Sequence, residues 1–130
     1  MKGEPVKTLR VGIATYEEMK AMTLALAQGI RKRGPNEPRI WFPSTESFAK
    51  VLSAENRNLL RVIAEKRPAS LDELEQLTGR RKPNLSRTLK TMENYGLVRL
   101  NRGPRRKISP EVTHERIELD LPILDREHAA

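Results

Sequence analysis

Residues 70–107 constrain the fold of this 130-residue chain most strongly. The stretch begins SLDELEQLTG, where Ser70 and Glu73 have the spacing of a helix-capping box and Gly79 is suited to end the helix. A second helical pattern follows, and then a turn rich in arginine. This order predicts a helix, a tight turn, a second helix and a two-stranded β-hairpin with a cationic tip.

The second helix is predicted to have an apolar back and a polar front. Leu85, Leu89 and Met92 fall at i, i+4 and i+7 and form one stripe that must be buried. Pro83 suits the first helical position, and Gly96 suits the left-handed position after the end. The other side carries hydrogen-bonding groups that can reach base edges or phosphates: Asn84, Ser86, Arg87, Lys90, Thr91 and Asn94.

The charges of this segment are strongly biased. Glu93 is its one acid between Arg80 and Lys107. Ten basic residues lie in the same range: Arg80, Arg81, Lys82, Arg87, Lys90, Arg99, Arg102, Arg105, Arg106 and Lys107. An ordinary solvated face mixes both signs, so the bias favours a polyanionic partner over a helix that merely faces water. The net charge of +8 indicates the same class of partner.

Other function classes find little support. The chain has no cysteine, so disulfides and thiol chemistry are excluded. We see no signal peptide and no membrane span, and we expect a cytoplasmic protein. We find no phosphate-binding glycine loop, no metal-ligand spacing and no nucleophile elbow; His114-Glu115 is a lone pair that we interpret as structural. We therefore expect no catalytic residue, no metal, no cofactor and no enzyme activity.

The segment before residue 44 has the pattern of a strand-helix-strand module. Residues 7–13 alternate and predict a strand, and residues 39–42 predict a second strand that pairs with it. Thr15 and Glu18 form a capping box for a helix to about Arg33, ended by Gly34-Pro35-Asn36. We expect five apolar residues to form its buried face: Tyr16, Met19, Met22, Leu26 and Ile30. Trp41 is expected in the core or a dimer interface.

Residues 44–110 are predicted to form the main domain. Ser44 and Ser53 are suited to begin a short helix and a helix to about Arg67. The inner face of the helix after Ser70 is expected to contain Leu71, Leu74 and Leu77. The hairpin should begin at Leu97, turn at residues 102–104 and return at Lys107 and Ile108, with Ser109-Pro110 breaking the return strand.

Residues 111–130 are predicted to form a C-terminal strand and tail. Ile117, Leu119 and Leu121 alternate on one side of a strand at residues 116–121, which we expect to pair with the N-terminal strands of the same chain or of a partner. The three predicted units are the strand-helix-strand module 1–43, which we expect to mediate dimerisation, the DNA-binding domain 44–110, and the C-terminal strand and tail 111–130. The predicted fold class is α+β, mainly α: a winged helix-turn-helix with an N-terminal strand-helix-strand extension and a C-terminal strand.

From about Trp41 to Ile108, the chain resembles the DNA-binding domain of MarR-type winged-helix regulators. The most diagnostic matches are Ser70 with its leucines, Gly79, the string NLSRTL at 84–89 and YGLV at 95–98. The resemblance implies that residues 82–95 enter the major groove and that the hairpin near Gly103 approaches the backbone or minor groove. The strand-containing flanks depart from the long dimerisation helices of those regulators. They look more like small predicted regulators of this class, some of which are antitoxins.

We therefore expect a dimeric, sequence-specific regulator that binds double-stranded DNA. Phosphates would be held by Arg80, Arg81, Lys90 and the hairpin cations, and bases would be read by Lys82, Asn84, Ser86 and Arg87. The expected interface also includes Thr91, Arg102, Arg105, Arg106 and Lys107.

The alternative is an antitoxin that regulates its own promoter through the same domain. It would bind a small toxin through the N-terminal module or through five acids: Glu111, Glu115, Glu118, Asp120 and Asp125. Those acids could equally form a solvated strand edge. Double-stranded RNA is a further candidate ligand, although its major groove is too narrow for side chains to read.

Overall fold

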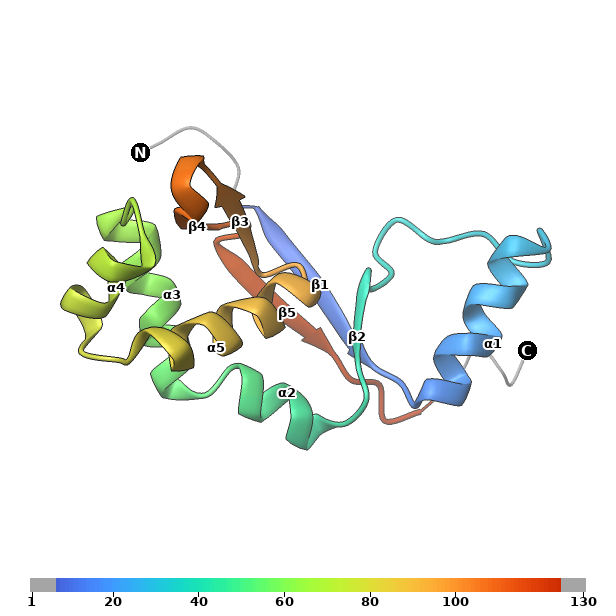
Figure 1. Cartoon of the computed structure of the whole chain (residues 1–130). Coiled ribbons are helices and arrows are strands. Elements are labelled where there is room, and N and C mark those ends of the chain that lie inside the picture. Colours follow the sequence, from blue (N-terminus) through green and yellow to red (C-terminus); the bar gives the residue numbers. More distant parts are fainter. Residues whose placement is uncertain (1–6, 125–130) are drawn as a thin grey trace.

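A three-stranded sheet joins the two ends of the chain in this computed structural model, which describes residues 7–124 (Figure 1). Its strands are β1 (Thr8–Ile13), β2 (Ile40–Phe42) and β5 (Arg116–Asp120), in the order β2-β1-β5. Both pairings with β1 are parallel. The predicted pairing of the two N-terminal strands is confirmed, and the C-terminal strand pairs within its own chain.

The two faces of this sheet differ because side chains alternate along a strand. Leu9 and Val11 are buried on one face, and their register partners on β5 are Ile117 and Leu119. The opposite face carries Arg10, whose guanidinium forms ion pairs with Glu118 at 3.0 Å and Asp120 at 3.5 Å. The apolar face therefore closes the core, while the polar face is held by charges.

Helix α1 (Tyr16–Ala27) follows β1 but contributes no buried residue. The Thr15–Glu18 capping box is confirmed by both of its hydrogen bonds. Two predictions for this helix are wrong. It ends at Ala27 rather than near Arg33, because Gly29 adopts a left-handed φ of +72° well before Gly34. The predicted face is not fully buried at any position, because α1 stands away from the sheet (Figure 1): Met19, Met22 and Leu26 are half-buried, and Tyr16 and Ile30 are exposed.

Four further helices form most of the remaining structure: α2 (Thr45–Val51), α3 (Ala54–Lys66), α4 (Leu71–Thr78) and α5 (Lys82–Asn94). The side chains of Ser44, Ser53 and Ser70 each accept a hydrogen bond from a backbone N–H in the first turn, as predicted. Gly79 ends α4 with a φ of +77°. Within residues 7–124 the helices cover more of the chain than the strands, so the fold is α+β and mainly α.

The core lies where these helices meet the apolar face of the sheet. Phe42 is fully buried, stacks on Tyr95 at 4.1 Å between ring centroids and meets Phe48 edge-on at 5.2 Å. Leu71 and Leu74 are buried as predicted. The prediction for Leu77 is wrong: its side chain is 43 % exposed, on the outer side of the short helix α4.

The predicted hairpin is present, with corrected ends. Strands β3 (Val98–Arg102) and β4 (Ile108–Val112) are antiparallel, and a short 3₁₀ turn η1 (Pro104–Arg106) forms the tip. Pro110 does not break the return strand but pairs in register with Leu100. Proline is tolerated there because the sheet has two strands, so β4 has a free edge that needs no N–H donor.

Candidate nucleic-acid interface

The buried back of α5 fixes which side chains face outward. Leu85, Leu89 and Met92 are at most 1 % exposed, which confirms the predicted stripe. The opposite side of the helix is exposed at Asn84, Ser86, Arg87, Lys90 and Thr91. The helix begins at Lys82 rather than Pro83, so the proline occupies the second position, where its missing N–H costs no helical hydrogen bond. The packing therefore presents the predicted polar surface of α5 to solvent.

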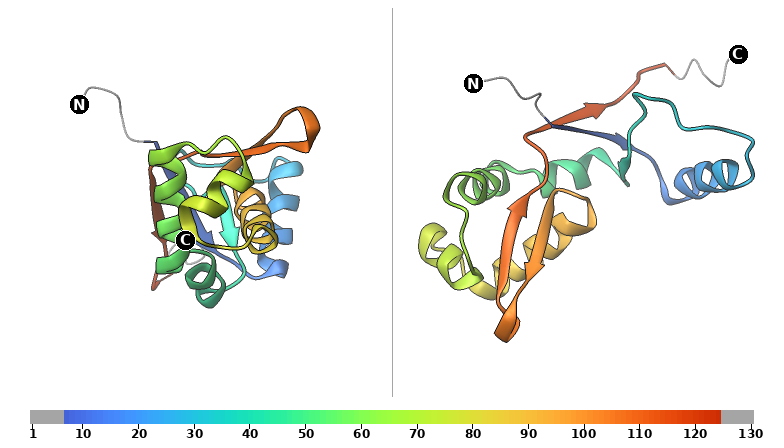
Figure 2. Two further views of the ribbon diagram at one scale, coloured as in Figure 1. Left: turned by 60° about the vertical axis from the view of Figure 1, so that its left-hand side comes forward. Right: turned by 90° about the horizontal axis from the view of Figure 1, so that it is seen from above.

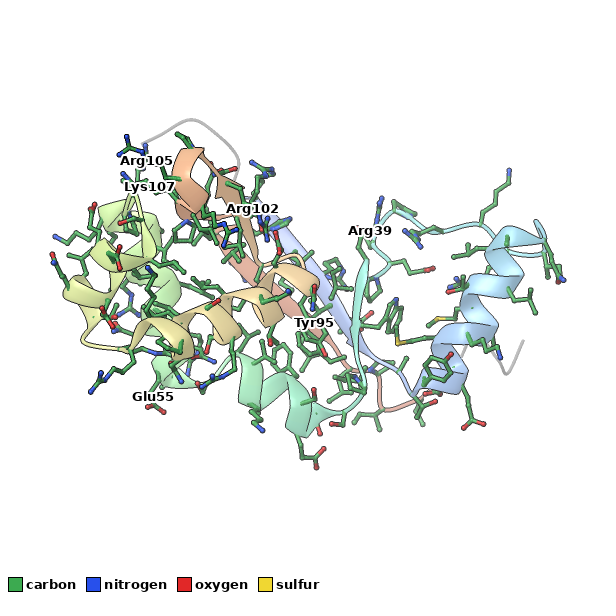
Figure 3. All side chains as sticks on the ribbon, viewed as in Figure 1. Arg39, Glu55, Tyr95, Arg102, Arg105 and Lys107 are labelled. Atoms are coloured by element: carbon green, nitrogen blue, oxygen red, sulfur yellow. The ribbon has the colours of Figure 1, made fainter. Side chains whose placement is uncertain are left out.

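The hairpin tip extends on the same side of the molecule as α5. Both views of Figure 2 show the tip reaching past the helices on the side where α5 lies. Arg105 and Lys107 are at the end of the hairpin, and Arg102 lies further back along β3 (Figure 3). Arg102 also reaches Glu93 of α5 across 3.8 Å, which links the two elements. Helix and hairpin thus contribute to one surface.

Six cations of this surface form no ion pair and no side-chain hydrogen bond with any residue between 7 and 124. They are Arg81, Arg87, Lys90, Arg105, Arg106 and Lys107. All six are exposed, three from α5 and its N-cap and three from the hairpin tip. Unpaired cations gathered in this way attract a polyanion, because each can replace a condensed counterion.

The backbone of the tip holds its arginines in an uncommon conformation. Arg105 and Arg106 have φ values of +61° and +60°, the left-handed region that favours glycine. A hydrogen bond of 2.7 Å from the Gly103 N–H to the Lys107 carbonyl closes the turn around them. Non-glycine residues in this region cost free energy and often mark functional positions.

The other predicted contact cations have partners inside the chain. Lys82 pairs with Asp72 at 3.0 Å, and Arg102 pairs with Glu93. Arg80 is the most engaged, because its guanidinium donates to Asn56 on α3 and to Asn84 and Thr88 on α5. Arg80 therefore links α5 to α3. Its guanidinium is better placed to hold the two helices together than to bind a phosphate.

The hydrogen bonds from Arg80 limit the contacts that Asn84 can make with a base. Its Oδ1 accepts hydrogen bonds from Arg80 Nε at 3.0 Å and Nη2 at 2.9 Å. A bidentate contact with adenine needs both the oxygen and the amide nitrogen of an asparagine. While Arg80 holds Oδ1, Asn84 is left with its amide N–H groups as donors. Ser86 and Arg87 are then the exposed base-reading candidates of α5 that carry no such internal bond in the described chain.

The hydrogen bond from Arg80 to Asn56 could not be found by sequence patterns. Asn56 lies 24 residues away from Arg80, in a different helix. Pattern rules act over a few residues and count every exposed arginine alike. The separation of outward cations from supporting ones depends on the packing of α3 against α5.

The acids considered for a toxin partner are largely used within the chain. Glu111 pairs with Arg99 at 3.2 Å, and Glu118 and Asp120 pair with Arg10. Glu115 is exposed, while Asp125 lies outside the described residues. This surface consequently offers little free negative charge to a basic partner.

A hollow of about 1480 Å³ lies between α3 and the segment that links β4 to β5. His114 lines it and is half-buried; its Nδ1 is 2.7 Å from the hydroxyl of Thr113. Burial lowers the pKa of the His114 imidazole, and the positive charge of Lys7 lowers it further. Among residues 7–124, no group of three or more His, Cys, Asp and Glu side chains is placed to hold a metal ion. No helix in that range is long and apolar enough to cross a bilayer.

Comparison with known proteins gives one match. A family model described as HVO_A0114 matches residues 51–119, from the end of α2 through most of β5. Neither the curated proteins nor the solved structures contain a match to the chain.

Proposed function

The chain belongs to the HVO_A0114 family, and we propose that the region matched by the family model is a winged helix-turn-helix that binds double-stranded DNA. Helix α4, the turn at Gly79 and helix α5 would be the helix-turn-helix, and the β3–β4 hairpin would be the wing. The observation that carries this proposal is the group of six unpaired cations around the exposed polar face of α5 and the hairpin tip.

In the proposed complex, α5 lies in the major groove, which is wide enough for a helix. Its buried stripe leaves Ser86 and Arg87 facing the base edges, and Arg can bind guanine O6 and N7. Arg81 and Lys90 lie on the same exposed side and would hold phosphates. The tip residues Arg105 and Arg106 would approach the backbone or the minor groove.

A B-form duplex suits this surface better than double-stranded RNA. The major groove of an A-form helix is too narrow and deep for side chains to read. An exposed helix with hydrogen-bonding side chains along one face gains base contacts in DNA that it cannot make in duplex RNA. DNA is therefore the ligand that uses both halves of the surface.

We further propose that the protein is a cytoplasmic transcriptional regulator of MarR-like type, acts as a homodimer and has no enzymatic role. One α5 contacts only a few base pairs, so two copies are needed for useful affinity. Two half-sites would then lie about 34–36 Å apart, centre to centre. Such a dimer binds a DNA sequence with the same two-fold symmetry as itself.

The experiment starts from the duplexes that the purified chain selects from a random pool. Arg87→Ala should weaken binding to the selected site by roughly 1–3 kcal/mol, the value of a good base contact, and should relax the preference at one position. Lys50→Ala is the matched control, because it removes one exposed cation from α2, outside both α5 and the hairpin. Full sequence preference in the Arg87→Ala variant, or equal competition by duplex RNA, would contradict the proposal.

A further inference from the structure

Helix α1 has the composition of a buried helix but no buried residue. From Met19 onward its apolar side chains occur on all sides rather than along one stripe: Met19, Ala21, Met22, Leu24, Ala25, Leu26 and Ala27. A helix that is apolar all round normally lies inside a protein or a membrane. In the described chain, α1 instead stands away from the sheet that it follows (Figure 1).

Exposed apolar side chains are concentrated in two segments. Eight large hydrophobic residues are exposed within residues 7–124, and Leu77 is the one that lies elsewhere. The seven others belong to α1, the turn after it, or the end of β5 and its tail: Tyr16, Leu24, Ile30, Leu119, Leu121, Ile123 and Leu124. Ile30 is 76 % exposed and Ile123 is 92 % exposed.

The sheet topology brings these two segments to one end of the molecule. Because β1 and β5 are parallel, α1 after β1 and the tail after β5 both leave at the carboxyl ends of the strands. Figure 1 shows this end far from α4 and the hairpin tip. An interaction at this end would leave the exposed face of α5 and the tip accessible.

The exposed apolar area matches that of a protein interface. The seven side chains together expose on the order of 700–800 Å², close to the area that each partner buries in a standard interface. In addition, a shallow hollow of about 390 Å³ lies between the first turns of α1 and β2, lined by Met19, Trp41 and Tyr95 among others. The side chains of residues 7–124 leave this hollow beside α1 unfilled.

We propose that α1 and residues 119–124 of one copy pack against the same elements of a second copy. The contact is isologous, because each copy contributes the same surface to a two-fold axis. The choice of a second copy as the partner rests in part on the proposed function, which needs two α5 helices. The exposure of α1 and of the tail is independent of that function.

The test is the mass of the full-length, DNA-free protein in sedimentation experiments over a wide concentration range. The unchanged chain should have twice its monomer mass. Leu24→Lys in α1 and Ile123→Lys in the tail should each weaken dimerisation by at least about tenfold, because a two-fold interface contains each substitution twice. Leu77→Lys is the matched control: it changes an equally large exposed side chain outside the patch and should leave the dimer intact.

Circular dichroism of each variant shows whether the chain is still folded, which separates lost dimerisation from unfolding. A folded chain that stays monomeric at every concentration would overturn the proposal, as would dimers unaffected by both lysine variants. Vesicles of phosphatidylcholine and phosphatidylglycerol provide a further arm: binding of a monomeric chain to them would assign the patch to lipid instead. Arg87→Ala should keep the dimer mass while losing its preference for the selected DNA. A failure of the proposed function can therefore be distinguished from a failure of the proposed dimer.

Discussion

Residues of the same type have different tasks in this molecule, and their neighbours decide which. Arg87 is exposed on α5, whereas the guanidinium of Arg80 donates hydrogen bonds to Asn56, Asn84 and Thr88. Both are arginines of the same basic segment, and both were predicted to contact DNA. Removal of Arg80 would therefore break the hydrogen bonds that link α3 to α5, in addition to removing a positive charge.

Gly12 shows the same dependence on a neighbour. The Trp41 ring lies over it, and a Cβ at position 12 would sit against ring atoms Cζ3 and Cε3, closer than van der Waals contact allows. We expect Gly12→Ala to lower the free energy of unfolding by about 1–3 kcal/mol, because the ring and the strands must move to accommodate the methyl group. Urea titration followed by circular dichroism measures the change.

Gly34→Ala is the control for this substitution. A Cβ at Gly34 would have no neighbour nearer than the Glu37 carboxylate at 4.0 Å, so the same methyl group meets open space there. If Gly12→Ala were as stable as Gly34→Ala, the Trp41 ring would not be packed on β1 as described.

At the scale of elements, the hairpin tip and α5 should contribute differently to binding. The tip carries Arg105, Arg106 and Lys107 without ion-pair partners in the described chain. It lies at the end of the hairpin rather than on α5 (Figure 3), so we expect it to contact phosphates rather than bases. Phosphate contacts add affinity for every DNA sequence alike, and each contributes to the salt dependence through released counterions.

Arg105→Ala should therefore weaken binding to selected and scrambled duplexes by the same factor. The slope of log affinity against log salt concentration should fall by about 0.9, the value for one phosphate contact on B-form DNA. Fluorescence anisotropy at several salt concentrations measures the slope, with Lys50→Ala as the control. An unchanged slope, or a loss confined to the selected sequence, would show that the tip does not act through phosphates.

At the scale of the whole molecule, the short link from β4 to β5 connects the hairpin unit to the sheet. His114 lies in this link and lines the hollow beside α3. Since burial and then the charge of Lys7 lower the pKa of its imidazole, the folded chain binds a proton there less readily than the unfolded chain does. The stability that the neutral imidazole contributes is present above its unfolded pKa of about 6.5 and is lost as the pH falls through the lower folded pKa.

This linkage is tested by thermal unfolding measured from pH 8 to pH 5, a range of about three pH units that contains the unfolded pKa. The unchanged chain should lose more stability on acidification than His114→Gln, which has no proton to bind at that position. Equal pH profiles for the two proteins would mean that His114 titrates alike in the folded and unfolded states.

Many elements could be predicted from the sequence because their causes are local. Ser44, Ser53 and Ser70 cap helices through hydrogen bonds that span three residues, and the stripe of Leu85, Leu89 and Met92 follows from the helical repeat. The hairpin and the pairing of the first two strands were predicted on the same grounds. The errors at the end of α1 and at Pro110 also have local reasons. Gly29 adopts a left-handed φ before Gly34 is reached, which ends α1 early, and an edge strand tolerates Pro110 because it needs no N–H donor there.

The sequence by itself determined where chain direction changes and which side of α5 is apolar, because those properties depend on residues within one or two turns of each other. Tertiary structure alone decided that no residue of α1 is buried, that Arg80 bonds to Asn56 of α3, and that β5 pairs with β1 of its own chain rather than of a partner. Each of these depends on contacts between residues far apart in the chain. Packing selects such contacts by shape and burial across the whole molecule, and no short pattern specifies them.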